Sequence, residues 1–349
     1  MSKIRFAKDE VLLVASRGIE QHHGLWLWSD QDGSWAGRQI GAVRQLSSLT
    51  GHPHLPVVYG TAGTGQDGSL HAWRIDADGA VKLSETSSEG AEPCDLEVDP
   101  SGRLLIATNY TSSTLALQRL DAAGAFEGPV SLLRLSGNGP ETDRQDDAHP
   151  HQAFFVGDIL IVIDLGADLV REFALRLDGQ GGDILTEIRT TPVPAGTGPR
   201  HGVALPDGRL AISGELGENL IVGRLGGGAD DWANVRSTRL SGPAKTRWTR
   251  NYPGDIRRSP DGRHVYFANR SHDTLATFEV SGAVPELVSE RDTKVRWPQH
   301  ILVRDGHLLI AGWDSASVVS MPLSDGIPQE AQPLFDCYGA GWLHAHTIG

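Results

Sequence analysis

The sequence predicts an all-β fold, a seven-bladed β-propeller, and two repeated patterns along its 349 residues support this prediction. In the first pattern, two short apolar strands flank a small polar cluster, and a glycine turn follows. Clear copies span 100–120 and 259–280, and further copies begin at Val11, Val57, Ile159, Pro206 and Gly306. The closing glycines are Gly33, Gly79, Gly124, Gly179, Gly227, Gly282 and Gly326. Their spacing of about 44 to 55 residues matches one four-stranded blade.

The second pattern is a short motif of proline, any residue, then His, Asp or Gln, then an apolar residue, and it precedes the copies. It is found at Pro93-Cys-Asp-Leu96, Pro150-His-Gln-Ala153, Pro199-Arg-His-Gly202, Pro253-Gly-Asp-Ile256 and Pro298-Gln-His-Ile301, with weaker forms at His52-Pro-His-Leu55 and Trp342-Leu-His-Ala345. We assign these segments to the innermost strand of each blade. The last one has no blade after it, so it should pair with the strand that starts at Val11 and leave no free sheet edge. Residues 1–349 are therefore expected to form a single domain.

Charge and composition narrow the class of partner. The net charge of −13 argues against binding to nucleic acid or to an anionic membrane surface, because proteins that bind either one carry an excess of Lys and Arg. A few arginines can still make one pocket positive on an acidic protein. The two cysteines predict no disulfide framework, and the chain has no apolar run of membrane-spanning length. We expect a cytoplasmic protein, while its oligomeric state stays open.

Equivalent positions of the blades converge at one mouth of the channel, and two such positions carry charge. The residue after the motif proline is Pro53, Cys94, His151, Arg200, Gly254, Gln299 or Leu343. The residue that ends the next strand is Arg17, Tyr110, Leu165, Glu215, Arg270 or Trp313. A histidine and a carboxylate can move protons near neutral pH, and two arginines can bind an anion and stabilise an oxyanion. The alternative is ordinary: such polar residues can bond only to water or to the next blade.

The segment Gly196-Thr-Gly-Pro-Arg-His-Gly202, followed by Leu205-Pro-Asp-Gly-Arg209 and Glu215-Leu216, resembles the lactonase family of seven-bladed propellers. The pattern of this family is also matched by His149-Pro-His-Gln152, by Asp164–Asp168, and by Ser259-Pro-Asp-Gly-Arg263 with Ala268-Asn-Arg270. This family includes bacterial 6-phosphogluconolactonases and a fungal carboxy-muconate lactonising enzyme. Gly214 and Gln152 depart from the family pattern, which usually has Asn and Ser there.

The resemblance implies a catalytic set and a set of substrate-binding neighbours. The catalytic set is His151, Arg200, Glu215 and Arg270, the same four residues that the blade alignment selects. The neighbours expected to contact the substrate are His201, Asn109, Asp164, Tyr110 and Trp313. No cofactor and no metal are expected. Two metal sites are alternatives: His149 and His151 with His201 or His300, and a divalent-ion set of Glu215, Asn109 and Asn269.

Three functions remain open on this evidence. The first is hydrolysis of a sugar-derived lactone such as 6-phosphogluconolactone, with Glu215 or His151 as the general base. The second is a cycloisomerase that lactonises an unsaturated dicarboxylate with the same residues. The third is a propeller that binds a ligand or partner without catalysis. The expected partner in the first two cases is a small anionic lactone or dicarboxylate.

Overall fold

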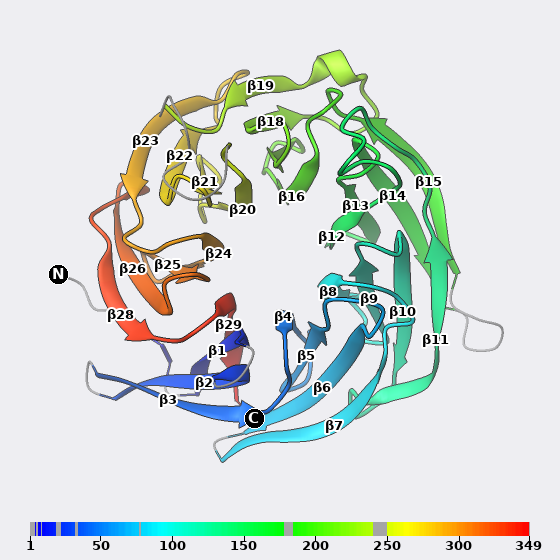
Figure 1. Cartoon of the computed structure of the whole chain (residues 1–349), viewed down its shortest axis with the longest axis vertical. Helices are drawn as coiled ribbons and strands as arrows, with labels where there is room; N and C mark the ends of the chain where they lie inside the picture. Colours follow the sequence, from blue (N-terminus) through cyan, green and yellow to red (C-terminus); the bar gives the residue numbers. More distant parts are fainter. Residues whose placement is uncertain are drawn as a thin grey trace.

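The computed structural model describes residues 4, 6–7, 9–18, 22–31, 34–76, 78–177, 184–239 and 250–348. Seven β-sheets stand around a central channel (Figure 1), which confirms the predicted seven-bladed propeller. Of the predicted closing glycines, Gly33 and Gly179 lie outside the described residues. Among the residues that are described, no helix is both long and apolar enough to cross a bilayer.

Each blade is one antiparallel sheet whose innermost strand faces the channel. Blade 1 contains β29 (Ala340–Thr347), β1 (Glu10–Arg17), β2 (His23–Gln31) and β3 (Ser34–Gly41). Blade 2 contains β4 (Leu46–Gly51), β5 (Val57–Ala62), β6 (Ser69–Asp76) and β7 (Gly79–Ser87). Blade 3 contains β8 (Pro93–Val98), β9 (Leu104–Asn109), β10 (Thr114–Leu120) and β11 (Phe126–Arg134). Blade 4 contains β12 (Pro150–Val156), β13 (Ile159–Asp164), β14 (Leu169–Arg176) and β15 (Ile184–Pro192).

The remaining blades follow the same order. Blade 5 contains β16 (Pro199–Ala204), β17 (Leu210–Gly214), β18 (Asn219–Gly223) and β19 (Ala233–Arg236), with a short 3-10 helix η1 (Ala229–Asp231) before the last strand. Blade 6 contains β20 (Pro253–Arg258), β21 (His264–Asn269), β22 (Thr274–Glu279) and β23 (Glu286–Asp292). Blade 7 contains β24 (Pro298–Arg304), β25 (His307–Gly312), β26 (Ser317–Ser324) and β27 (Ile327–Pro328), and β28 (Gln332–Asp336) also pairs with β26.

The ring closes within blade 1, as predicted. The C-terminal strand β29 pairs antiparallel with β1, with Leu13 opposite His344, and Figure 1 shows these two strands side by side. Neighbouring inner strands contact one another all the way around, including β24 with β29 and β29 with β4. The pairing with β29 covers the edge of β1, which would otherwise be open to unwanted strand pairing.

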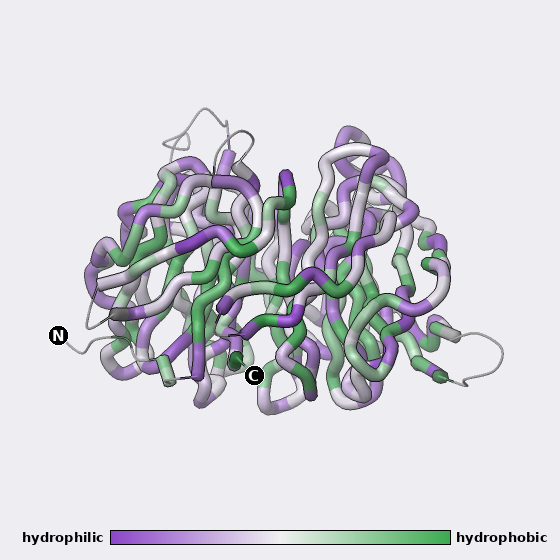
Figure 2. Tube along the Cα trace, turned by 90° about the horizontal axis from the view of Figure 1, so that it is seen from below, coloured by the Kyte–Doolittle hydropathy of each residue, from purple (hydrophilic) through white to green (hydrophobic). Residues whose placement is uncertain are grey.

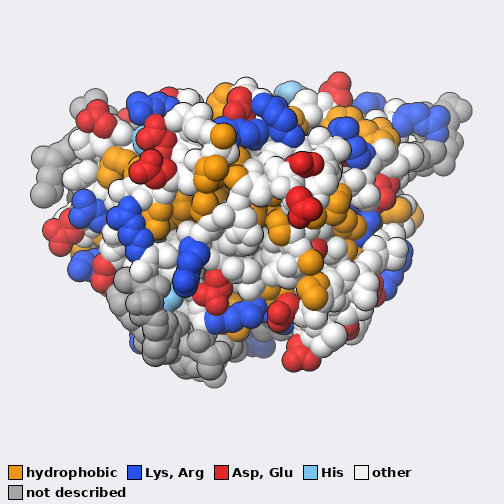
Figure 3. Space-filling model, turned by 90° about the horizontal axis from the view of Figure 1, so that it is seen from above, with side chains coloured by type: hydrophobic (Ala, Val, Ile, Leu, Met, Phe, Trp, Pro, Cys, Tyr) orange, Lys and Arg blue, Asp and Glu red, His pale blue; other side chains and the backbone are white. Residues whose placement is uncertain are grey.

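The hydrophobic core is divided into seven clusters, one between each pair of neighbouring blades. Between blades 1 and 2, for example, Leu13 and Leu25 pack with Val58 and Trp73. Seen edge-on in Figure 2, hydrophobic colour concentrates along the strands between the two loop faces. On the face shown in Figure 3, basic and acidic side chains are interspersed. The apolar contacts hold the blades at fixed angles, so loops at the channel mouth are positioned by a rigid frame.

Candidate active site

Every inner strand contains a β-bulge near its start, and in five blades the side chain at the bulge lines the cavity at the channel mouth. The pairing register shifts at Ser47, Cys94, His151, Arg200, Gly254–Asp255, Gln299 and Gly341. A bulged residue has no partner opposite it, and the local kink re-aims its side chain. Five of these positions are the ones predicted from the proline motif.

The predictions for the other two blades were wrong. Pro53 lies in the turn after β4, so Ser47 occupies the bulge, and in β29 the bulge is at Gly341 and not at Leu343. Leu343 is buried in the apolar cluster between blades 7 and 1. The weak motifs misled because neither strand begins with proline, so the sequence alone could not locate the bulge.

The second converging position is held by a backbone hydrogen bond. The residue after the second strand, or at its end, donates its N–H to a carbonyl just before the inner strand of the same blade. Examples are Tyr110 to Glu92 at 3.1 Å, Glu215 to Gly198 at 2.9 Å and Arg270 to Tyr252 at 3.3 Å. Bulge residue and strand-end residue therefore meet at the same mouth in each blade.

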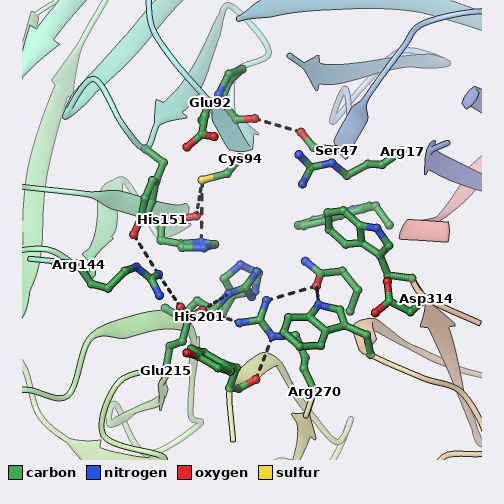
Figure 4. Close-up of a pocket in the computed structure, with 18 of the residues that line it drawn as sticks. Arg17, Ser47, Glu92, Cys94, Arg144, His151, His201, Glu215, Arg270 and Asp314 are labelled. Carbon is green, nitrogen blue, oxygen red and sulfur yellow. Dashed lines mark hydrogen bonds and ion pairs between the residues drawn. The ribbon is translucent and has the colours of Figure 1, made fainter. Parts of the chain in front are cut away.

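These positions enclose a cavity of about 470 Å³ at the channel mouth (Figure 4). The predicted residues that line it are His151, Arg200, Glu215, Arg270, His201, Tyr110 and Trp313. Arg17, Cys94, Arg144 and Trp297 also line it. The volume falls within the range of about 300–1,000 Å³ usual for small-molecule sites. All four residues predicted to be catalytic thus surround one cavity, although their roles remain a prediction.

Glu215 is the centre of an arginine cluster. Its Oε2 accepts from Arg270 Nη2 at 2.5 Å, its Oε1 accepts from Arg144 Nη2 at 2.7 Å, and Arg200 Nε lies 3.1 Å from Oε2. Burial alone would raise the pKa of Glu215, but the charges of Arg270, Arg144 and Arg200 outweigh it and hold the pKa well below its usual range. The carboxylate therefore stays ionised and is a very weak proton acceptor.

Contacts on several sides hold the Arg270 side chain in place. Its Nε donates to the carbonyl of Tyr252 at 2.9 Å, and its guanidinium lies 5.0 Å from the centre of the Trp297 ring. Burial, with the nearby charge of Arg200, lowers the pKa of Arg270 to about 10, which still leaves it charged at neutral pH. Its bonds to Glu215 and Tyr252 leave it little freedom to follow a substrate.

Arg200 differs, because part of its guanidinium is unused. The side chain is 5% exposed and its Nε is paired with Glu215, but its Nη1 has no hydrogen-bond partner among the described residues. Buried donors without partners are uncommon and costly, so they point to a ligand that accepts from them. In Figure 4, Arg17 lies on the other side of the opening from Glu215 and Arg270. Its guanidinium is 4.4 Å from the centre of the Trp313 ring.

His151 is a neutral imidazole in this cavity. Burial and the nearby Arg200 and His201 hold the pKa of His151 well below its usual range. Its ring meets Tyr110 edge to face at 5.5 Å, and its Nδ1 lies 3.9 Å from the Cys94 sulfur. Burial raises the pKa of Cys94 to about 12, so this residue is a thiol and not an activated nucleophile.

Two of the expected substrate contacts are structural residues instead. Asn109 is fully buried, and its amide donates to the Ser88 carbonyl and to Thr114 Oγ1, both at 3.0 Å. Asp164, also fully buried, accepts from the His149 N–H at 2.8 Å and from Arg171 Nε at 2.8 Å.

Both residues end a second strand, one position before the residue that follows the strand at the mouth. Successive strand residues face opposite sides, so the shift of one position turns these side chains away from the cavity. Neither lines the cavity in the described part of the chain.

The geometry also disfavours both metal alternatives. His149 precedes β12, stacks on Tyr110 at 4.6 Å and bonds through Nδ1 to the Tyr110 carbonyl at 2.9 Å. Unlike His151, it does not line the cavity. Asn269 is fully buried and accepts from Asn251 at 2.7 Å. Within the described ranges, no three His, Cys, Asp or Glu side chains are grouped so as to hold a metal ion.

Sequence reasoning missed Arg144, which lies in the connection between β11 and β12. It bonds Tyr110 Oη at 3.2 Å as well as Glu215. Gln145 orders this connection by donating to the Leu165 carbonyl at 2.8 Å. Because the connection is not part of the repeat, blade alignment contains no signal for it.

The two departures from the family pattern are also explained by contacts. Gln152 Oε1 accepts the Gly202 N–H at 2.7 Å and so joins blade 4 to blade 5. A Cβ at Gly214 would meet Asn219 Oδ1 at 1.8 Å, so Asn219 occupies the space that a larger residue would need.

Comparison with known proteins places this architecture in a family. The family model described as lactonase, 7-bladed beta-propeller matches residues 34–325. The chain belongs to this family. It is 28% identical to the 6-phosphogluconolactonase of Bacillus subtilis (strain 168) over 75% of this chain and 76% of that protein. Two solved structures share the fold, each at 21% identity. A Bacteroides fragilis protein aligns with a TM-score of 0.84 over 98% of this chain and 99% of that one. The periplasmic gluconolactonase PpgL of Pseudomonas aeruginosa aligns with a TM-score of 0.81 over 97% of this chain and 99% of that one.

Proposed function

We propose that this protein hydrolyses a sugar-derived lactone that carries an anionic group. The observation that carries the proposal is the unpartnered Nη1 of the buried Arg200 guanidinium, in a cavity that Arg17 also lines. A lactone needs one cation at its carbonyl oxygen, where charge develops, and its anionic group needs another. The 6-phosphogluconolactonases related to this chain make 6-phosphoglucono-δ-lactone the first substrate to test.

In this proposal Arg200 stabilises the tetrahedral oxyanion and Arg17 binds the anionic group. Glu215 acts by orientation: it holds the guanidiniums of Arg144, Arg200 and Arg270 in one arrangement. Both of its carboxylate oxygens already accept from arginines, so a histidine is the better acceptor for the proton of the attacking water. A cytoplasmic location stays a prediction, since PpgL, with the same fold, is periplasmic.

The test is the rate of opening of 6-phosphoglucono-δ-lactone, followed by the acid released in a fast indicator assay. The wild-type protein should exceed spontaneous opening by several orders of magnitude, and Arg200→Ala should lower kcat by about 10²–10³-fold. Arg74→Ala is the matched control, because Arg74 is exposed on β6, outside the cavity. A wild-type rate equal to the spontaneous one would refute the proposal.

Lactonisation of an unsaturated dicarboxylate is the second candidate, and the two cations Arg17 and Arg200 favour it because they would suit two carboxylates. Loss of muconate ultraviolet absorbance on adding protein would separate it from hydrolysis. If neither reaction occurs, and both Arg200→Ala and Glu215→Ala leave the biological function intact, the propeller is a binding module.

A further inference from the structure

His201, the neighbour of Arg200 in β16, has one ring nitrogen bound and one unused. Its Nδ1 lies 2.9 Å from Asp255 Oδ1 of β20. Its Nε2 has no hydrogen-bond partner among the described residues, although the residue is only 2% exposed and lines the cavity. The ring meets His151 edge to face at 5.2 Å.

His201 occupies a position that has a structural role in other blades. At this position Asp95 accepts the Ala153 N–H at 2.9 Å, Gln152 accepts the Gly202 N–H at 2.7 Å, and Asp255 accepts the Ile301 N–H at 2.8 Å. In each case a side-chain oxygen bonds the backbone of the next blade and joins the two inner strands. His201 instead bonds a side chain of the next blade, and its second nitrogen is left at the cavity.

The bond to Asp255 determines which nitrogen carries the proton. A carboxylate oxygen only accepts, so His201 Nδ1 must donate, and in the neutral ring Nε2 then has a free lone pair. Asp255 cannot easily turn away, because it is fully buried and its Oδ2 also lies 3.2 Å from Arg257 Nε. Hydrolases use the same relation to orient a histidine and to stabilise the imidazolium that forms.

We propose that His201 is the general base of the lactonase reaction and that Asp255 is its positioning residue; this inference rests on the proposed function. His201 Nε2 takes a proton from water while the water oxygen bonds to the lactone carbonyl carbon. The resulting oxyanion lies beside Arg200. The bond between this carbon and the ring oxygen then breaks, and His201 returns its proton to that oxygen. Lactone and water give one hydroxy acid, which loses its carboxyl proton to solvent.

His201 is a better candidate than His151 on geometry. Among the described residues no carboxylate bonds the His151 ring, whose Nδ1 lies beside the Cys94 sulfur instead. The groups facing His201 are Asp255 and Arg257 of β20, His151 of β12, Arg200 beside it, Arg270 after β21 and His300 of β24. Burial, Arg200, Arg257 and Arg270 hold the pKa of His201 well below its usual 6.5, so the neutral base persists at pH 6.5 and above.

The kinetic experiment measures kcat for 6-phosphoglucono-δ-lactone between pH 4.5 and 8. His201→Asn keeps a donor for Asp255 but lacks a base, so kcat should fall by about 10²–10⁴-fold and the acid limb of the profile should disappear. Asp255→Asn should lower kcat comparably, because it no longer specifies the tautomer. Asp95→Asn is the matched control: it makes the same change at the equivalent position of blade 3 and should leave kcat and the acid limb unchanged.

A second measurement does not depend on activity. In protein labelled with ¹⁵N-histidine, His201 should show the Nδ1–H tautomer at pH 7, and Asp255→Asn should abolish this preference. An Nε2–H tautomer in the wild type would overturn the inference. So would an active wild type whose rate falls less than tenfold in His201→Asn, and this result would leave the lactonase proposal intact. An inactive wild type would refute the lactonase proposal, and the general-base role would fall with it.

Discussion

Replacing Glu215 with Gln should destabilise the protein strongly, because it removes the negative charge that three guanidiniums share. The Glu215 side chain is 5% exposed, and Arg200 and Arg270 are 5% and 8% exposed, so water cannot take over this role. Breaking a buried ion pair by removal of one partner typically costs about 3–5 kcal/mol. We expect Glu215→Gln to lower the free energy of unfolding at pH 7 by about that amount.

Glu97 in β8 is a matched control with the opposite expected sign. Burial, and next the charge of Asp95, raises the pKa of Glu97 to about 8, so its carboxyl is mostly protonated in the folded protein at pH 7. In the unfolded chain it ionises near 4.5, so rising pH between 4.5 and about 8 favours unfolding. Glu97→Gln mimics the protonated form and should therefore stabilise the protein at pH 7, by up to about 3 kcal/mol.

The pH dependence of the Glu215 effect follows from the opposite shift. The folded-state pKa is depressed, so the contribution of Glu215 is complete above the unfolded value of 4.5. It is lost as pH falls below 4.5 and through the folded-state pKa. The difference between wild type and Glu215→Gln should be constant from pH 8 to about 5 and should shrink in more acidic buffer.

Urea unfolding followed by tryptophan fluorescence at several pH values would measure these differences. The reasoning would be refuted if Glu215→Gln stayed within about 1 kcal/mol of the wild type at pH 7. It would also be refuted if the two substitutions changed stability in the same direction.

Three further substitutions test individual contacts. Arg200→Lys keeps the charge but loses the planar array of donors, so kcat for the lactone should fall at least tenfold. An unchanged kcat would show that the unpartnered Nη1 is not used. Asn109→Ala should lower the free energy of unfolding by about 1–3 kcal/mol, because it leaves the Ser88 carbonyl without its donor. The kcat per folded molecule should stay constant, and a large loss of kcat would show that Asn109 contributes to the active site. Arg144→Ala should destabilise by less than about 1 kcal/mol, since its side chain is 39% exposed, and urea unfolding beside Glu215→Gln would reveal any larger cost.

The sequence alone was sufficient to predict the propeller and the convergence of the four residues predicted to be catalytic. Each blade repeats the same pattern of strands and turns and therefore folds in the same way, so residues at equivalent positions meet at one mouth of the channel. His151 and Arg200 follow a motif proline that begins an inner strand, and Glu215 and Arg270 follow a second strand. Local pattern and fold agree at these positions, and the same reasoning predicted the pairing of β29 with β1.

Only the tertiary structure decided which neighbours share the cavity and what each can do. The bulges of β4 and β29 lie at Ser47 and Gly341 and not at Pro53 and Leu343, because neither strand begins with a proline. Strand alternation turned Asn109 and Asp164 away from the cavity. Arg144 comes from a connection that does not repeat. Protonation depends on charges from other blades: Glu215 is ionised because three arginines surround it, and His201 is oriented by Asp255 of the next blade. Such couplings act through space, and a one-dimensional pattern contains no record of them.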